Sequence, residues 1–398
     1  MCNVGDDNFD DLENSKYMPA KEKISPFSKC NKCREATPIV VLRSKDKYCK
    51  ECFLSGTVHK FKALLGKHKL IRPNDRVLVV HRCGHAGTAL LHFIRTGLDL
   101  GTHKKLRFEP VVLFVEDHSH LSLKERQELL KRVEHEINYF KFTMHLTSLS
   151  HLIRKGVNSE VLKNCAEILD LDDDSKSIID NFVTKQTNTT NKTDFLNIAR
   201  HKFMVDIAKE LNCKFIFTPE ISSDVASQLL TDVSLGRGSH IALNTGFCDF
   251  RDDTVKILRP LRLFDMKELG FYNHLNSLNP VTYRIVIDNP YKSIQHLMRK
   301  FVNDLQVNYP ATVTTILKTG DKLALGSNKI RTCDLCNAPF EEESADLNSA
   351  ESTQFSHWVS TQAHNSSLTS QERYIQTIEA FNNLTCDTYC FRCRQLMK

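Results

Sequence analysis

The sequence predicts an α/β fold, a doubly wound parallel sheet with a small cysteine-rich module at each end. Between residues 73 and 270, apolar strand-like runs alternate with helix-like segments, the pattern typical of a parallel sheet covered by helices. Pairs of cysteines in CxxC spacing stand on both sides of this region. These two observations set the expected domain plan.

The elements of the central region follow in order along the chain. Strands are expected at residues 77–80, 110–115, 141–146 and from 214 onward, where short β-branched and aromatic runs occur. Helices are expected at 88–98 and 196–211, where apolar residues recur with helical spacing. A further helix is expected after Ser122, because Ser122 and Glu125 form a capping-box pattern.

The flanking segments differ in composition. Residues 1–28 are polar and acidic and are expected to form a disordered tail. Residues 29–56 should form the first cysteine module and residues 57–72 a basic helical linker, while residues 271–398 contain the second module. Two polar tracts, 170–194 and 341–371, are interpreted as insertions.

Composition and charge limit the classes of function. Of the 398 residues, 41% are hydrophobic and 26% are charged, which is typical of a globular protein, and no apolar run approaches the ~20 residues of a membrane-spanning helix. The first residues are acidic and polar where a targeting peptide is basic and apolar, so a cytoplasmic location without a membrane partner is expected. A net charge of +6 permits an anionic partner such as RNA.

Eight cysteines form two candidate sites for structural zinc. Four thiolates on two tight turns suit a tetrahedral zinc ion, and a small segment with few apolar residues needs such an ion to fold. The first set, a predicted zinc ribbon, is Cys30, Cys33, Cys49 and Cys52. The second set is Cys333, Cys336, Cys390 and Cys393. Its two pairs are separated by 53 residues, and Cys386 is a rival ligand.

The stretch VLVVHRCGHAGTALLHFI, residues 77–94, has the outline of a phosphate-binding turn between a strand and a helix. Glycines let backbone N–H groups converge on an anion, and the following helix offers its positive N-terminus. The candidate nucleotide loop comprises Arg82, Cys83, Gly84, His85, Ala86, Gly87 and Thr88. Two glycines alone are a weak motif, so these residues leave open whether the loop is active.

A family resemblance rests on a combination of motifs. The zinc ribbon, LLTDVSLGRGSHIA at 229–242, the RPLR segment at 259–262 and the terminal CxxC pairs together resemble the second subunit of the cytosolic tRNA 2-thiolation complex. The resemblance covers roughly residues 30–398. It implies a degenerate PP-loop ATP pyrophosphatase fold of the adenine nucleotide alpha hydrolase-like type.

The resemblance also implies a function and partners. The function is 2-thiolation of wobble uridine 34 in the tRNAs for lysine, glutamate and glutamine. The implied partners are a catalytic thiouridylase subunit in a heterodimer, tRNA, and a thiocarboxylated ubiquitin-related modifier that supplies sulfur.

Departures from the catalytic pattern indicate a subunit without catalytic residues. The loop of catalytic relatives reads SGGxDS, whereas this chain keeps Gly84 and lacks the aspartate and the serine. The side chains of Cys83 and His85 would crowd a pyrophosphate. The segment TPEISSDVA at 218–226 lacks the usual glycine–histidine pair, and no CxxC lies between Cys52 and Cys333. We therefore expect ATP to bind to the partner subunit rather than to this chain.

Basic residues are the candidates for tRNA contact, because lysine and arginine side chains bind phosphates. They are Lys60, Lys62, Lys67, Lys69, Arg72, Arg237, Arg259 and Arg262. The same residues are compatible with solvated surface charge. Two alternative functions also stay open: a catalytically competent ATP pyrophosphatase with an atypical phosphate loop, and a zinc-ribbon adaptor without an RNA role.

Overall fold

The computed structural model describes residues 29–42, 46–102, 105–157, 174–186, 188–283, 289–323, 330–341 and 388–397, with a few isolated positions between 352 and 375. The expected acidic tail, most of the 341–371 tract and the rival ligand Cys386 lie outside these residues. The chain divides into two compact units, Met1–Lys60 and Phe61–Lys398.

The first unit carries the predicted zinc ribbon. Strands β1 (Val40–Leu42) and β2 (Asp46–Tyr48) pair antiparallel, and helix α1 (Lys50–His68) begins directly after Cys49. Val40 and Phe53 are two large apolar side chains of this unit that are buried. Helix α1 continues through most of the expected linker, and the boundary between the units, Lys60, falls within it.

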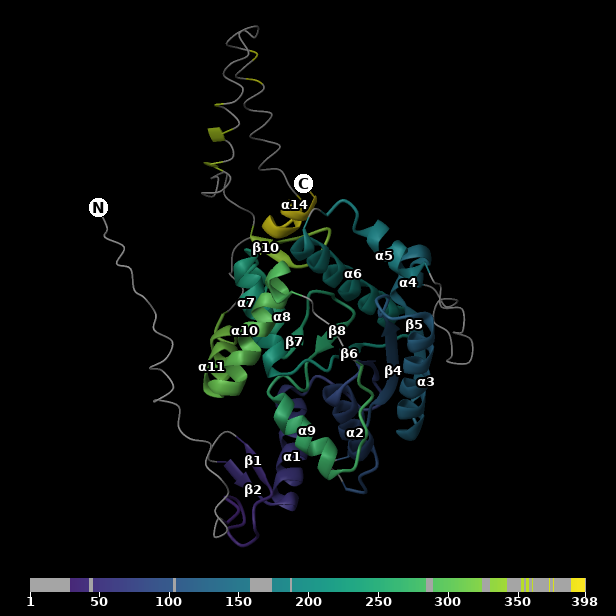
Figure 1. Cartoon of the computed structure of the whole chain (residues 1–398), viewed down its shortest axis with the longest axis vertical. Helices are drawn as coiled ribbons and strands as arrows, with labels where there is room; N and C mark the ends of the chain where they lie inside the picture. Colours follow the sequence, from purple (N-terminus) through teal and green to yellow (C-terminus); the bar gives the residue numbers. More distant parts are fainter. Residues whose placement is uncertain are drawn as a thin grey trace, which may run out of the picture. The chain divides into compact units, whose positions relative to one another are not determined.

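A six-stranded sheet in the order β5-β4-β3-β6-β8-β7 forms the centre of the second unit (Figure 1). Its strands are β3 (Arg76–His81), β4 (Glu109–Glu116), β5 (Thr143–Ser148), β6 (Phe215–Phe217), β7 (Cys248–Asp249) and β8 (Lys256–Leu258). Neighbouring strands are parallel except β7, which pairs antiparallel with β8 at one edge. The doubly wound parallel sheet is confirmed, and the chain reverses its direction of progress across the sheet between β3 and β6.

The central strands are covered on both faces. Leu78 and Val79 point to opposite sides of the sheet, because side chains alternate along a strand, and they are 0% and 1% exposed. On one face, α4 (Leu149–Lys155) and α6 (Thr189–Glu210) pack against a core cluster that contains Leu78 and Ile216. Burial on both faces explains why these strands are continuously apolar in the sequence.

One predicted helix begins at the expected residue, and two begin earlier: α6 begins at Thr189 rather than at residue 196. Helix α3 (Leu123–Tyr139) has the predicted capping box: the Glu125 amide donates to Ser122 Oγ (3.4 Å), and the Ser122 amide donates to Glu125 Oε2 (2.9 Å). Helix α2 (His85–Leu98) begins earlier than residue 88, because Gly84 already serves as its N-cap. The described part of the 170–194 tract is largely helical, since it contains α5 (Ser175–Phe182) and the start of α6.

Three helices lie side by side beyond β6: α7 (Ser222–Ser234), α10 (Ile294–Asn308) and α11 (Pro310–Gly320) (Figure 1). They enclose a small core that includes Val225, Val302 and Val313. The terminal cysteine module consists of β9 (Ile330–Thr332), β10 (Pro339–Glu341) and α14 (Phe391–Met397) with their cysteines. The shorter connecting elements are η3 (Gly238–His240), α8 (Ile241–Thr245), α9 (Met266–Leu275) and η4 (Pro290–Lys292).

Within the described part of the chain, no helix combines the length and the hydropathy that crossing a bilayer requires.

Candidate functional site

The two cysteine sets predicted from the sequence each come together. In each set, the four Sγ atoms lie within 4.8 Å of one another. The Sγ atoms of Cys33 and Cys49 are 4.0 Å apart, and those of Cys336 and Cys390 are 3.9 Å apart. Zn–S bonds of ~2.3 Å place the sulfurs of a tetrahedral site ~3.8 Å apart. Each set therefore fits a single tetrahedral metal ion.

The two sets are built in the same way. After the first CxxC pair the chain turns back through a residue with positive φ, Arg34 (φ 61°) or Asn337 (φ 54°). The amide of each of these residues donates to the carbonyl of the pair's first cysteine, 2.8 Å away in both cases. The second CxxC pair lies at the N-terminus of a helix, α1 or α14. Such an end favours thiolates, since unpaired amides and the helix dipole stabilise negative charge there.

The candidate nucleotide loop has the backbone of a phosphate turn. Gly84 has φ +114° and caps α2. Gly87 packs so closely that a β-carbon there would lie 2.0 Å from the carbonyl oxygen of Arg82. Both positions are therefore restricted to glycine by the fold of the loop itself.

The side chains of the loop do not offer the chemistry of a phosphate site. Thr88 carries the only hydroxyl of the loop, is 1% exposed, and donates a short hydrogen bond to Glu136 of α3. Burial, together with the charge of Glu136, raises the pKa of the Cys83 thiol to about 12, so this thiol stays neutral at physiological pH. Asn273 of α9 donates to the carbonyl of His85 (2.9 Å) and so anchors the loop to α9.

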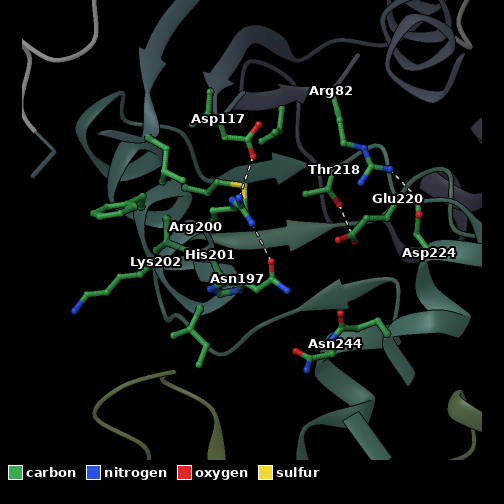
Figure 2. Close-up of a pocket in the computed structure, with 18 of the residues that line it drawn as sticks. Arg82, Asp117, Asn197, Arg200, His201, Lys202, Thr218, Glu220, Asp224 and Asn244 are labelled. Atoms are coloured by element: carbon green, nitrogen blue, oxygen red, sulfur yellow. Dashed lines mark hydrogen bonds and ion pairs between the residues drawn. The ribbon is translucent and has the colours of Figure 1, made fainter. Parts of the chain in front are cut away.

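A cavity of about 500 Å³ lies beside this loop, at the ends of the parallel strands. Arg82 follows β3, Asp117 follows β4 and Thr218 follows β6, and all three line the cavity (Figure 2). The carboxyl ends of parallel strands, at the point where the strand order reverses, are the usual place for a ligand in such sheets.

Three arginines that line the cavity are paired with carboxylates of the same chain. Arg82 donates to Asp224 (2.8 Å), Arg200 lies 3.2 Å from Asp117, and Arg259 donates to Glu220 (2.6 Å). Figure 2 shows Arg82 reaching Asp224, and Arg200 lying between Asp117 and Asn197. The cavity wall therefore mixes both signs of charge, which disfavours a triphosphate.

Similarity to known proteins decides the family. The sequence profile described as cytoplasmic tRNA 2-thiolation protein 2 matches residues 293–395. A protein of that name from Aedes aegypti is 33% identical over 84% of this chain and 75% of its own length. This chain belongs to the cytoplasmic tRNA 2-thiolation protein 2 family. The human family member is 28% identical over 90% of this chain and 81% of its own length. The sequence-based resemblance to this family is thus confirmed.

A solved structure supports the fold. The U34-tRNA thiolase NcsA from Methanococcus maripaludis, described with its [4Fe-4S] cluster, superposes with a TM-score of 0.55. It is 16% identical and covers 74% of this chain and 87% of its own length. The comparison shows that this chain shares the fold of that thiolase.

Three arginines expected at tRNA are instead structural parts of the fold. Arg237, Arg259 and Arg262 are 6%, 5% and 4% exposed. Arg237 forms a double hydrogen bond with Asp194, Arg259 also donates to the carbonyls of Leu243 and Gly246, and Arg262 reaches Asp321 and the carbonyl of Thr245. A guanidinium that is buried and paired in this way is not available to a phosphate, so the expectation for these three residues is corrected.

The basic segment near α1 lies differently. Lys67, Lys69 and Arg72 are exposed, whereas Lys60 and Lys62 are half-buried. Lys60 belongs to the first unit and the other four residues to the second.

The carboxylates of the site are not among the residues predicted from the sequence. Asp117 and Glu220 each follow a predicted strand within a few residues, and that position was a usable signal. Asp194 gave no signal, because it lies in a polar tract that was interpreted as an insertion.

A substitution at Gly87 tests how closely the loop is packed. Substitution Gly87→Ala should destabilise the chain by about 1 to 3 kcal/mol, because the added methyl group meets a backbone oxygen. Urea denaturation of the full chain measures this change. Gly270→Ala in α9 is the matched control: nothing lies within 4 Å of its β-carbon position, so it should be neutral or up to about 1 kcal/mol stabilising. Equal effects at the two sites would contradict the close packing of the loop.

Proposed function

We propose that this chain is a non-catalytic subunit of the cytosolic tRNA thiouridylase complex, acting in the cytoplasm. The complex 2-thiolates wobble uridine 34 in the tRNAs for lysine, glutamate and glutamine. Family membership supports the reaction. The observation that carries the non-catalytic role is the state of the loop after β3, where Thr88 is turned into the protein and Arg82 is paired with Asp224.

The division of labour follows from this loop. Thiolation needs an activated uridine oxygen, and in this proposal ATP is bound by the catalytic partner subunit of a heterodimer. Sulfur comes to that partner from a thiocarboxylated ubiquitin-related modifier, which meets the complex at least transiently. This chain contributes support for the partner and contact with tRNA.

One observation favours the competing function, an ATP pyrophosphatase with an atypical loop. The cavity of about 500 Å³ keeps the position and size of a nucleotide pocket. Against it stand the internal pairing of Arg82, Arg200 and Arg259 and the absence of a free hydroxyl in the loop.

The two functions are separated by assays of the chain alone and in the complex. The isolated chain should bind ATP no more tightly than a Kd of about 1 mM, roughly −4 kcal/mol, in equilibrium dialysis with magnesium. It should also leave tRNA unthiolated with ATP and a sulfur donor. The catalytic subunit should gain wobble thiolation when this chain is added. Thiolation by this chain alone would show that it is the enzyme.

We further propose that each cysteine set holds a structural zinc ion. The close Sγ separations favour one ion per set rather than an iron–sulfur cluster, in which cysteines bind different irons and are spread apart. Zinc has no redox chemistry, which suits sites that complete small folds.

Metal analysis tests this assignment. Freshly purified chain should contain two equivalents of zinc and show no iron–sulfur absorption. The variant Cys30→Ser/Cys33→Ser and the variant Cys333→Ser/Cys336→Ser should each lose one equivalent, because each removes two of four ligands. A wild-type content of one equivalent or less, or the presence of iron, would remove one or both zinc sites from the proposal.

The exposed end of the basic segment is the proposed tRNA contact. Lys67, Lys69 and Arg72 lie within six residues of one another and are exposed. If they neutralise tRNA phosphates, their side chains release counterions on binding, and the affinity depends on salt.

A charge-removal variant checks the contact. Lys67→Gln/Lys69→Gln/Arg72→Gln should weaken tRNA binding by the complex. It should also flatten the slope of log K against log salt by up to about 2.1 to 2.7 if all three residues contact phosphates. Binding titrations at several salt concentrations measure the slope. Lys300→Gln on α10, an exposed lysine paired with Asp304, is the control and should leave it unchanged. An unchanged slope for the triple variant would assign these residues to solvated surface.

A further inference from the structure

The terminal cysteine module forms part of the cavity wall. Leu335, Cys336 and Asn337 of this module line the cavity together with Arg237 and His240. The terminal module and the LGRG motif, residues 235–238 directly after α7, therefore contribute to the wall of the same cavity. Nothing in the proposed function explains why this motif and the terminal cysteines occur together.

A single buried carboxylate joins three segments at this place. Asp194 of α6 accepts two hydrogen bonds from Arg237 (2.6 and 3.0 Å) and a third from Nε of Arg392 in α14 (2.8 Å). Asp194 is 2% exposed, and each arginine is 6% exposed. Arg392 also donates to the side chain of Asn191 (2.7 Å), one turn earlier in α6. The carboxylate thus links α6, the turn after α7 and α14, which contains Cys393 and begins directly after Cys390.

Shape reinforces this link. Gly236 has φ +73°, and a β-carbon on it would lie 2.9 Å from the ring of Phe391, the first residue of α14. At the other end of α14, Gln186 donates from its buried side chain to the carbonyl of Leu396 (2.8 Å). These contacts fix both ends of α14, and Phe391 packs directly against the turn after α7. That turn needs a glycine at position 236.

Charge gives a reason for the arrangement. Zinc with four thiolates carries net negative charge, and a buried anion requires hydrogen bonds or cations around it. Arg237 interacts electrostatically with Cys393, and Arg251 donates to the carbonyl of Cys336 (3.5 Å). The buried His240 lines the same cavity wall as Cys336. Groups of this kind orient metal ligands and raise the affinity of the site.

We propose that Asp194 is a positioning residue for the terminal metal centre and couples it to the cavity wall. When the terminal cysteines hold their metal, α14 is fixed, Arg392 is fixed on Asp194, and Asp194 in turn orients Arg237. When the metal leaves, the start of α6 and the turn after α7 lose a shared anchor. The terminal metal thereby keeps one side of the cavity in shape.

The first experiment measures zinc release from the full, zinc-loaded chain with a chromogenic chelator. Asp194→Asn keeps the shape of the side chain but removes its charge, and it should speed release of one of the two zinc ions by about 10- to 100-fold, with the other unchanged. Asp99→Asn is the matched control, because Asp99 pairs with Arg95 at an exposed site. Release at the wild-type rate from Asp194→Asn would overturn the proposal.

The second experiment measures hydrogen exchange of the same chain. Cys333→Ser/Cys336→Ser should raise exchange at residues 189–200 and 235–245, whereas Cys30→Ser/Cys33→Ser should leave these segments unchanged. Unchanged exchange in the terminal variant would refute the coupling. If Asp194→Asn does not fold, Arg392→Gln removes only the hydrogen bonds from α14. This variant should speed release of one zinc ion and raise exchange at residues 189–200 and 235–245.

The coupling rests on the proposed zinc sites, and the two claims fail separately. A wild-type chain with only one equivalent of zinc removes the metal centre itself. If the chain holds two equivalents of zinc but Asp194→Asn does not change the rate of zinc release, the zinc sites stand and the coupling through Asp194 is refuted.

Discussion

The pairing of buried guanidinium groups is the constraint on which the second unit depends. A buried charge that loses its partner costs several kcal/mol, so each such arginine must meet an acceptor. The acceptors of Arg237, Arg259 and Arg262 come from α6, from the turn between β6 and α7, and from the residue after α11. The contacts that satisfy these charges therefore also join three separate segments of the second unit to the rest of it.

The outline of the phosphate loop has a cause that is independent of phosphate. Gly87 is required because the carbonyl of Arg82 lies where a β-carbon would be. The loop is also held by the hydrogen bond from Asn273 to the carbonyl of His85. These contacts are internal to the protein, and they hold the strand–loop–helix geometry whether or not an anion binds. A glycine pattern in a sequence thus reports the backbone path more directly than it reports the ligand.

Four strands of the sheet, helices α2, α3 and α6, and both cysteine sets were predictable because their signals are local. Strand runs, the Ser122 capping box and CxxC spacing each lie within a few residues. The roles of the arginines were not predictable, because their partners are distant: Asp194 and Arg237 are 43 residues apart, and Asp194 and Arg392 are 198 apart. The basic character of Arg237 suggested a phosphate, but only the fold reveals that a carboxylate occupies its hydrogen bonds.

Two features of the loop oppose anion binding, and their magnitudes differ. Arg82 is 49% exposed on its side chain and Asp224 is 22% exposed, so their ion pair contributes at most about 1 kcal/mol and an incoming anion would compete with it readily. The hydrogen bond from Thr88 to Glu136 is buried, and its loss would leave a carboxylate unsatisfied at a cost of about 1 to 3 kcal/mol or more. The orientation of Thr88 is therefore the stronger obstacle. A chain that regained only its free arginine would attract phosphate without recovering the hydroxyl of a phosphate loop.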